Sequence, residues 1–412
     1  MSLHGLLSVT MGVPNVEETA AYYADFGLAP EEDGWFSTRD AGRQLRIVHA
    51  PTRRLVEMRI GVDDQDDLNR VAASLARLDL PHAQTGPALE TAEPVTGTRV
   101  RLEISSRLKQ DLVTATPYNG PGRLERQGNR APGFMRGDPV RPRKLGHAVL
   151  GTTDYATTSR FFAEGLGFKI SDRIVGVAAF LRCSTDHHNV LVLAAPVNFL
   201  HHTSWQVDDI DDVGRGAQAM LEGNPERHIW GLGRHYAGSN FFWYLKDPAG
   251  NFSEYYSDMD CIPEDQLWTP EDLEGARSLF AWGPPPPPSF LHPDDLAAMM
   301  TGAHAPRLRA RRTGLGFTDT GRARPEIRSP ADRARCHNST HAHSTLVHRG
   351  LLRLEPGLRP GLHGRHGVAR PPAGRTRHPP RLRGRPHRPD GHHRGRGPRQ
   401  RGRGARGDHP GA

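Results

Sequence analysis

The chain has 412 residues, a formal net charge of +8 and 36% hydrophobic residues, so it is long enough for two or more domains with cores of their own. It has no basic-then-apolar start that resembles a signal peptide and no apolar stretch long enough to span a bilayer, so we expect a cytoplasmic protein without a membrane partner. The three cysteines, Cys183, Cys261 and Cys336, lie too far apart to suggest a disulfide framework or a cysteine-ligated zinc site.

The positive charge is confined to the end of the chain. From Thr301 onward there are 26 of the 54 basic residues, all of them arginine, and 6 of the 46 acidic residues, which gives a net charge of +20. The residues before Thr301 therefore hold 28 basic against 40 acidic side chains, a net charge of −12. Because this body is acidic, the high overall pI does not indicate a nucleic-acid-binding protein.

The first 135 residues begin with an apolar strand and a helix. The strand is expected at "LLSVTMGV", residues 6–13, and the helix at "NVEETAAYYADFGL", residues 15–28, with its asparagine as the N-cap and glycine at its close. Strand-like stretches such as "QLRIVHA", residues 44–50, follow the helix. A second helix is expected within "VDDQDDLNRVA", residues 62–72. This order predicts β-α-β-β-β modules.

The same pattern returns after a linker rich in glycine, proline and arginine at residues 119–144. "GHAVLGTT" at 146–153 predicts a strand, and "DYATTSRFFAEGLGF" at 154–168 predicts a helix capped by its aspartate. "NVLVLAAP" at 189–196 predicts a further strand. "VDDIDDVGRGA" at 207–217 repeats the acidic helix start of the first half.

We therefore predict an α+β fold of four β-α-β-β-β modules, two in each half of the body. The boundaries place an N-terminal domain at residues 1–135 and a C-terminal domain at residues 136–275.

The last module contains a hairpin signal, "FFWYLKDPAGNFSEYYSD", at residues 241–258. Its Asp-Pro-Ala-Gly sequence, residues 247–250, predicts the turn, and bulky residues on both sides predict the strands. Side chains two apart share one face of a strand, so Glu254 lies on the face of Phe252 and Tyr256. A carboxylate between two aromatic rings should face water or a partner that offsets its desolvation.

Two segments follow the repeat. Residues 276–302 form a Pro-rich extension that we expect to pack across the surface. Residues 303–412 form a tail rich in arginine, proline, glycine and histidine, which cannot bury enough apolar surface to fold and is expected to be disordered. The tail is an RGG-like arm for a polyanion, an appendage without a role, or the product of a frameshift near residues 300–312. The frameshift is favoured because a shifted reading frame in GC-rich DNA would encode mostly Arg, Pro, Gly, Ala and His, and the tail has this composition and no lysine.

Three side chains from separate strands suggest a metal site. His147 and His202 each open a strand in the same phase, with a bulky residue three positions later and an acidic helix cap seven positions later. Glu254 lies on the last strand of the fourth module. Two imidazoles and one carboxylate are what an iron(II) facial triad needs, with adjacent coordination positions left open.

The internal repeat supplies a control for this interpretation. The positions equivalent to His147 and His202 in the first half are Ser8 and Glu57, and Glu103 is the candidate for the position of Glu254. Both histidines are therefore missing from the first half. The second half alone is equipped for a metal.

The body resembles the vicinal-oxygen-chelate superfamily, and within it the two-domain class I extradiol ring-cleavage dioxygenases of the catechol 2,3-dioxygenase and 2,3-dihydroxybiphenyl 1,2-dioxygenase type. The motifs that carry the resemblance are "KLGHAVLGTTD", "FLRCSTDHHNVLVL", "FLHHTSWQVDDIDD" and "GLGRHYAGSNFFWYLKDPAGNFSEYYSD". The resemblance covers about residues 3–260 and does not include the tail.

The resemblance implies Fe(II) held by His147, His202 and Glu254, with Mn(II) in a minority of relatives. It further implies insertion of both atoms of O2 into a catecholic substrate, cleavage of the ring beside the hydroxyls, and a homo-oligomer.

The resemblance also implies catalytic residues: His188 is the acid–base histidine, and His235 and Tyr244 hydrogen-bond the catechol. Some relatives have an arginine for a substrate carboxylate four residues before His235, where this chain has Gly231. The absence of this arginine, with the nearby aromatic residues, favours a hydrophobic or bicyclic catechol.

Each of these residues also has an ordinary structural interpretation. His201, next to His202, is an alternative candidate for the metal ligand, although strict alternation turns it to the opposite face of the strand. The same one-residue ambiguity concerns His187 and His188. His235 can simply be solvated in its glycine-rich loop, and Tyr244 can be core packing.

Three other functions remain open for the whole protein: a glyoxalase-like metal isomerase, a metal-free small-molecule-binding protein of the bleomycin-resistance type, and an inactive product with an altered C-terminus. The glyoxalase-like isomerase would usually draw ligands from both halves of its site, which Ser8 and Glu57 do not supply. His188, His235 and Tyr244 beside the triad argue against the binding protein.

Overall fold

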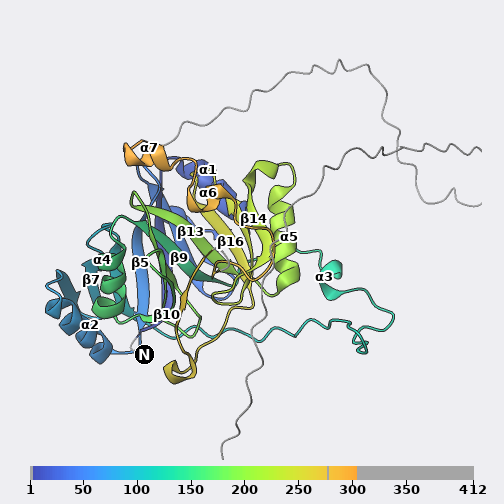
Figure 1. Cartoon of the computed structure of the whole chain (residues 1–412), viewed down its shortest axis with the longest axis horizontal. Helices are drawn as coiled ribbons and strands as arrows, with labels where there is room; N and C mark the ends of the chain where they lie inside the picture. Colours follow the sequence, from blue (N-terminus) through green and yellow to red (C-terminus); the bar gives the residue numbers. More distant parts are fainter. Residues whose placement is uncertain (1–2, 276–277, 304–412) are drawn as a thin grey trace, which may run out of the picture. The chain divides into compact units, whose positions relative to one another are not determined.

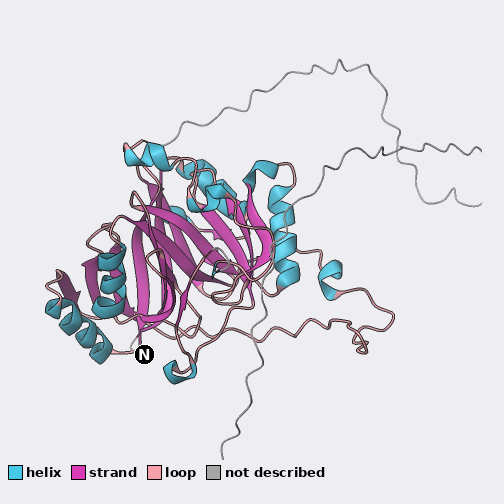
Figure 2. Ribbon diagram, viewed as in Figure 1, coloured by secondary structure: helices cyan, strands magenta, loops and turns pink. Residues whose placement is uncertain are grey.

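The computed structural model describes residues 3–275 and 278–303, which form two mixed β-sheets flanked by helices (Figures 1 and 2). The predictions made for the basic tail lie outside the described residues.

The N-terminal half forms an eight-stranded sheet with the order β2-β3-β4-β1-β5-β8-β7-β6. Its first module consists of β1 (Leu3–Val13), α1 (Val16–Asp25), β2 (Ala29–Pro30), η1 (Glu32–Gly34), β3 (Trp35–Thr38) and β4 (Gly42–His49). Its second module consists of β5 (Arg54–Val62), α2 (Gln65–Arg77), β6 (His82–Thr85), β7 (Ala88–Ala92) and β8 (Arg99–Ile104). The first strands of the two modules, β1 and β5, pair antiparallel at the centre of the sheet.

The linker contains one short helix, α3 (Pro132–Met135), and leads into a nine-stranded sheet with the order β14-β15-β16-β13-β9-β12-β11-β10-β17. The third module consists of β9 (Lys144–Thr152), α4 (Tyr155–Arg160), η2 (Phe161–Leu166), β10 (Lys169–Ile174), β11 (Ala178–Arg182) and β12 (Val190–Ala194). The fourth consists of β13 (Phe199–Gln206), α5 (Ile210–Leu221), η3 (Pro225–Arg227), β14 (His228–Arg234), β15 (Phe241–Lys246) and β16 (Phe252–Ser257). The prediction of an α+β fold with four β-α-β-β-β modules is confirmed.

Three of the four module helices begin with an aspartate that caps the N-terminus of the helix. The side chains of Asp64, Asp154 and Asp209 each accept a hydrogen bond from the backbone N–H three residues later, as N-caps do. Asn15 occupies the N-cap position of α1, but its side chain makes no capping bond. Its amide instead donates to the carbonyl of Pro248, in the turn of the other half, at 2.9 Å. Asn15 therefore stands at the predicted N-cap position without a side-chain cap, because its Oδ1 accepts from the Thr19 hydroxyl at 3.3 Å and not from the backbone.

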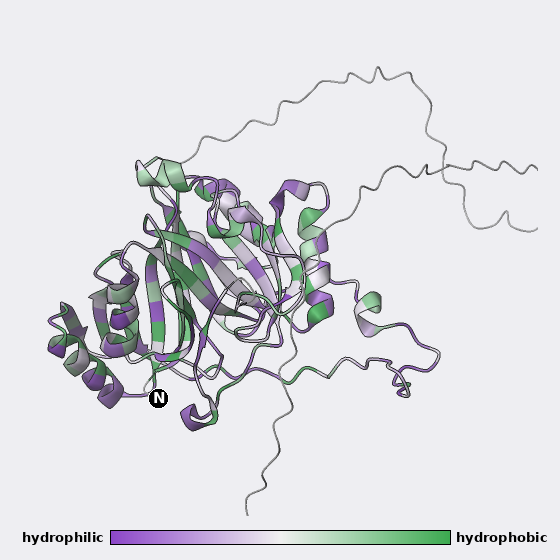
Figure 3. Cartoon of the chain, viewed as in Figure 1, coloured by the Kyte–Doolittle hydropathy of each residue, from purple (hydrophilic) through white to green (hydrophobic). Residues whose placement is uncertain are grey.

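Module 1 packs against module 4 through buried aromatic residues. The rings of Phe26 and Tyr255 stack at 3.8 Å between centroids, and the Tyr255 hydroxyl donates to the carbonyl of Phe26 at 2.7 Å. Tyr22 and Ser253 join the same two modules through a hydroxyl pair 2.6 Å apart. One continuous apolar core consequently includes residues of both halves, and Figure 3 shows hydrophobic and hydrophilic residues alternating along the strands around it.

The Pro-rich extension packs onto the C-terminal sheet and its neighbours. Before the extension, η4 (Asp265–Leu267) and β17 (Glu271–Leu273), which pairs parallel with β10, follow the fourth module. The extension itself contains α6 (Pro288–Leu291) and α7 (Leu296–Met300). The last described residues, 278–303, are called the strap below. Among the residues that the structure describes, no helix is long and apolar enough to cross a membrane.

A buried ion pair ties the strap to the N-terminal half. Arg53 is only 1% exposed, and its Nε and Nη2 donate to the two carboxylate oxygens of Asp295 at 2.6 and 2.9 Å. Its Nη1 donates to the carbonyl of Leu200 in β13. This cation therefore holds the strap and a central strand of the C-terminal sheet together.

Replacing Arg53 by methionine is expected to lower the free energy of unfolding by about 3–5 kcal/mol, because the carboxylate of Asp295 stays buried without its partner. Urea unfolding of the full chain measures this loss. Arg39→Met is the matched control, since the Arg39–Asp208 pair also joins the two halves but its arginine is 40% exposed, and it should cost no more than about 1 kcal/mol. Equal losses in the two variants would contradict the special role of the buried pair.

Candidate metal centre

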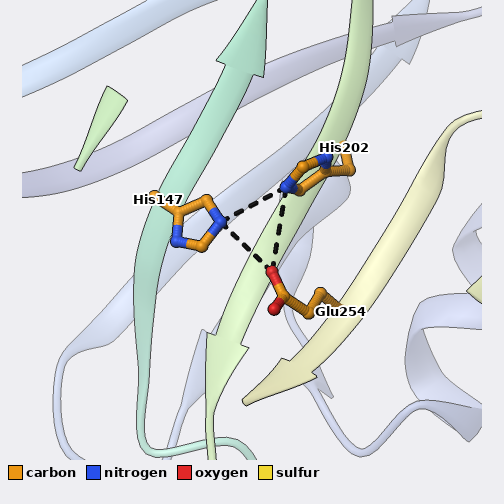
Figure 4. Close-up of side chains that lie close together, drawn as sticks. All are labelled: His147, His202 and Glu254. Carbon is orange, nitrogen blue, oxygen red and sulfur yellow. Dashed lines mark hydrogen bonds and ion pairs between the residues drawn. The ribbon is translucent and has the colours of Figure 1, made fainter. Parts of the chain in front are cut away.

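Three adjacent strands bring His147, His202 and Glu254 together (Figure 4). In the order β9-β13-β16, His147 lies opposite Ser204, and Ser204 lies opposite Glu254, so His147, Ser204 and Glu254 form one row across the sheet. His202 lies two residues before Ser204 in β13. The Nε2 atoms of His147 and His202 are 3.2 Å apart, and they lie 3.1 and 3.7 Å from Oε2 of Glu254. One ligand atom from each residue lies within 4.8 Å of the others, and all three side chains are buried.

The buried polar atoms of this cluster fit a divalent cation. Oε2 of Glu254 and Nδ1 of His147 have no hydrogen-bond partner among the described residues, and a buried carboxylate oxygen without a donor or a cation is costly. Oε1 of the same carboxylate accepts from the Asn240 amide at 3.1 Å, which leaves Oε2 for a metal. Two imidazoles and one carboxylate suit Fe(II) or Mn(II) and leave coordination positions for substrate.

Protonation states also suit a metal. Burial raises the pKa of Glu254, but contacts with the His147 and His235 rings outweigh burial and hold this pKa below its usual value, so the carboxylate is ionised. Desolvation lowers the pKa of His202 well below its usual value, which keeps the ring neutral as a ligand must be.

An apolar cavity of about 280 Å³ opens beside the triad. It is lined by histidines 147, 188, 201, 202 and 235 and by Tyr244, together with aliphatic and aromatic side chains such as Phe180, Leu191 and Phe290. A larger cavity of about 460 Å³ lies at the junction of the two halves, but its lining includes none of the triad residues. The smaller cavity is therefore the candidate substrate site.

His188 lies in the cavity directly beside His147, with 4.2 Å between the ring centroids. Its Nδ1 lies 3.1 Å from Nδ1 of His187, whose Nε2 donates to the carboxylate of Asp172 at 2.9 Å. Because His187 therefore accepts at Nδ1, His188 carries its proton on Nδ1 and exposes Nε2 to the cavity. Desolvation lowers the pKa of His188 well below its usual value. Of the two adjacent histidines, His188 is the one that lines the cavity.

His235 and Tyr244 form a pair on the other side of the triad. The Tyr244 hydroxyl donates to Nε2 of His235 at 2.9 Å, and Nδ1 of His235 donates to the carbonyl of Leu279 at 2.5 Å. Tyr244 pairs across the hairpin with Glu254, as the turn at 247–250 predicts. Burial, followed by the nearby Glu254 carboxylate, raises the pKa of Tyr244 well above its usual value, so the phenol stays protonated.

His201 lines the same cavity as His202, although strict alternation predicts opposite faces. The pairing of β13 with β9 has a register shift between Leu200 and His202, so His201 is the extra residue of a β-bulge. The expectation that His201 points away was wrong because of this bulge. The expectation that His201 stays outside the triad holds, since its ring hydrogen-bonds the carbonyl of Phe290.

The N-terminal half repeats the same register without the ligands. Ser8 lies opposite Arg59 just as His147 lies opposite Ser204, and Glu57 lies opposite Thr10 just as His202 lies opposite Val149. The equivalence of Ser8 and Glu57 with the two histidines is therefore confirmed.

The third position of the row differs from the expectation. Arg59 lies opposite Arg101 in β8, so Arg101 occupies the place of Glu254, and Glu103 lies two residues further along. Arg101 forms ion pairs with Glu90 and Glu103. In the N-terminal half, paired surface charges replace the metal ligands.

Some residues around the site are not indicated by any motif or spacing in the sequence. Asn240, which holds Glu254, and Asp172, which holds His187, are single polar residues without a repeated spacing. The carbonyls of Leu279 and Phe290 act through the backbone, so their side-chain identity says nothing about this contact.

Comparison with known proteins agrees with this geometry. Residues 144–255 match the model of the Glyoxalase/Bleomycin resistance protein/Dioxygenase superfamily. The chain is 37% identical over 187 residues to Metapyrocatechase 2 of Cupriavidus necator, which covers 43% of this chain and 57% of that protein. It is 29% identical over 154 residues to an iron-dependent extradiol dioxygenase of Rhodococcus jostii, which covers 34% of this chain and 50% of that protein. The chain thus spans little more than half the length of these relatives.

Among solved structures, the chain is similar to the Mn(II)-bound glyoxalase from Novosphingobium aromaticivorans. The TM-score is 0.56 at 25% sequence identity, and the match covers 70% of this chain and 94% of that one.

Proposed function

We propose that the chain, a two-domain member of the Glyoxalase/Bleomycin resistance protein/Dioxygenase superfamily related to metapyrocatechase, is an extradiol ring-cleaving dioxygenase. It inserts both atoms of O2 into a catecholic substrate and opens the ring beside the hydroxyls. The observation that carries the proposal is the buried two-histidine, one-carboxylate cluster at the end of an apolar cavity. In this proposal residues 136–275 form the catalytic domain, and residues 1–135 form a supporting domain without metal ligands.

His147, His202 and Glu254 hold Fe(II) in this proposal, with Mn(II) as the alternative. The iron-dependent relative and the Mn(II)-bound structural neighbour support both metals. When bound, such a metal supplies Lewis acidity toward the catechol oxygens and redox chemistry toward dioxygen.

The side chains around the triad bind the catechol and move its protons. Nε2 of His188 accepts a proton from the substrate and returns it later, because Nδ1 is engaged with His187. With substrate bound, the Tyr244 hydroxyl turns its proton from Nε2 of His235 to a substrate oxygen and so stabilises charge on it, and Nε2 of His235 is then free to accept from a substrate hydroxyl. The apolar lining excludes water, which strengthens each of these polar contacts.

The lining of the cavity favours a catechol with an apolar substituent. Val149, Ile174, Phe180 and Leu193 supply hydrocarbon surface, and the lining residues within 3–275 and 278–303, the ranges that the structure describes, include no lysine or arginine. The place of a substrate-binding arginine is taken by Gly231, whose φ of +142° and contact with Trp243 leave no room for a larger side chain. A carboxylated catechol would therefore meet no cation among the described lining residues to pair with.

This preference is tested with the full chain, loaded anaerobically with Fe(II) and then exposed to air. We expect a yellow ring-opened product from 2,3-dihydroxybiphenyl, with kcat/KM at least about tenfold above that for 3,4-dihydroxyphenylacetate, since one buried unpaired charge costs more than 1.4 kcal/mol. Oxygen uptake equal to product formed is the second measurement. A preference for the carboxylated substrate would contradict the proposed specificity.

A glyoxalase-type reaction is the second candidate, because the structural neighbour with 25% identity is a glyoxalase. It would require further ligands, and the positions of the N-terminal half equivalent to the triad offer Ser8, Glu57 and Arg101. Stoichiometric metal without ring-opened product from any catechol would favour this candidate.

We further propose a cytoplasmic homo-oligomer. Cys183 and Cys261 are both unpaired in the described part of the chain, which suits a reducing compartment. Apolar side chains between the two sheets' segments of the chain, including Leu112 before the linker and Phe134 and Met135 within it, are exposed and available for a second copy. Light scattering of the purified full chain gives its mass in solution.

A further inference from the structure

A β-bulge places a second histidine against the metal ligand His202. β13 pairs with β9 at Leu200 and at His202 but not at His201, so the extra residue turns its side chain toward the cavity. The repeat keeps this bulge, because β5 pairs with β1 at Leu55 and Glu57 and skips Val56. The bulge is thus common to both halves, whereas the histidine on it occurs only in the half with the metal ligands.

A hydrogen-bond chain runs from the strap through His201 to His202. Nε2 of His201 lies 2.6 Å from the carbonyl oxygen of Phe290, and Nδ1 of His201 lies 2.7 Å from Nδ1 of His202. A carbonyl only accepts, so His201 carries its proton on Nε2 and accepts at Nδ1. His202 must then donate from Nδ1, which leaves the Nε2 lone pair directed at Glu254 and His147.

We propose that His201 is a positioning residue of the metal centre: it fixes the tautomer and the ring orientation of His202, and the Phe290 carbonyl of the strap fixes His201 in turn. Metal-ligating histidines generally need such a partner on the second ring nitrogen. The inference rests on the metal site of the proposed function but not on the ring-cleavage reaction.

The strap is held firmly enough to serve as the fixed end of this chain. The ring of Phe290 is 5% exposed and packs against Tyr244 and His201, with centroid distances of 4.7 and 5.0 Å. Five residues later, Asp295 forms the buried ion pair with Arg53. Residues beyond the repeat therefore complete the surroundings of a metal ligand.

The other histidines of the site provide an internal comparison. Within the part of the chain that the structure describes, Nδ1 of His147 has no hydrogen-bond partner, so no comparable contact there holds its tautomer. His187 contacts His188 through the same Nδ1–Nδ1 arrangement, and its other ring nitrogen hydrogen-bonds Asp172. His188, however, is not one of the three triad residues. His187 therefore supplies a matched control for a variant of His201.

The test is Mn(II) affinity of the metal-free full chain, measured from the EPR signal of free Mn(II). We expect His201→Phe, which keeps the ring but removes both nitrogens, to weaken Mn(II) binding about 10–100-fold. His201→Asn should keep most of the affinity, because its amide oxygen can accept the proton of His202 Nδ1. His187→Phe should leave the affinity at the value of the unsubstituted chain.

Wild-type affinity in His201→Phe would overturn the inference, and so would equal losses in His201→Phe and His187→Phe, which would indicate general packing. If His201→Phe does not fold, the Asn variant decides: affinity near that of the unsubstituted chain supports the inference, and a loss of about 10-fold or more overturns it. An unsubstituted chain that binds no Mn(II) also overturns it. Tight Mn(II) binding without cleavage of any catechol contradicts the proposed function alone.

Discussion

Replacing Glu254 by alanine is expected to abolish ring cleavage and to weaken Mn(II) or Fe(II) binding by more than the roughly 10–100-fold that the loss of an outer hydrogen-bond partner costs. Glu254 supplies the one carboxylate of the triad, and its Oε2 has no hydrogen-bond donor to satisfy it. Metal content after dialysis and oxygen uptake with 2,3-dihydroxybiphenyl measure the two effects.

The thermal stability of the same variant separates a metal ligand from a structural carboxylate. Metal should raise the Tm of the unsubstituted chain but not that of Glu254→Ala, since a ligand that binds only the folded state stabilises it. Glu103→Ala is the control, because Glu103 lies in the equivalent strand of the N-terminal half and pairs with Arg101 at the surface. A Glu254→Ala variant that keeps its metal-dependent rise in Tm would contradict the role of this carboxylate as a ligand.

Replacing His188 by phenylalanine is expected to lower kcat by about 10²–10⁴-fold, the usual contribution of a positioned acid–base group. The phenyl ring keeps the packing against Phe180 and His147 but cannot accept or return a proton. Steady-state kinetics with 2,3-dihydroxybiphenyl measure the loss.

Metal affinity distinguishes this variant from the previous one. His188 is not part of the triad, so His188→Phe should bind Mn(II) as tightly as the unsubstituted chain while Glu254→Ala should not. His188→Gln, which hydrogen-bonds but does not transfer a proton in this range of pH, should be as slow as His188→Phe. Full activity in either His188 variant would contradict the assignment of proton transfer to this residue.

The N-terminal half has the same fold as the C-terminal half but other residues in place of the metal ligands. The row that holds His147 and Glu254 in the second half holds Ser8 and Arg101 in the first. Arg101 pairs with glutamates in the same sheet, so the charges balance without a cation. The first half is nevertheless coupled to the metal centre, because Arg53 holds both the strap and the strand that carries His202.

Local patterns determined the modules and most of the site. The acidic cap seven residues after each ligand histidine placed His147 and His202 in register, and caps are local interactions between neighbouring residues. The Asp-Pro-Ala-Gly turn placed Tyr244 opposite Glu254 for the same reason, since a short turn sets the pairing of its own strands. The repeat then made the missing ligands of the first half visible.

Long-range contacts and register shifts decided the rest. Alternation alone turned His201 away from the cavity, and a bulge changed that result. The sequence offered Glu103 as the candidate for the position of Glu254, and the pairing of β5 with β8 gives that position to Arg101. Phe290 and Leu279 reach the histidines through backbone carbonyls, which every residue type has. The sequence by itself therefore determined which side chains can bind the metal, because ligand chemistry belongs to the side chain. Only the tertiary structure decided what orients them, because that depends on where the backbone of the strap comes to lie.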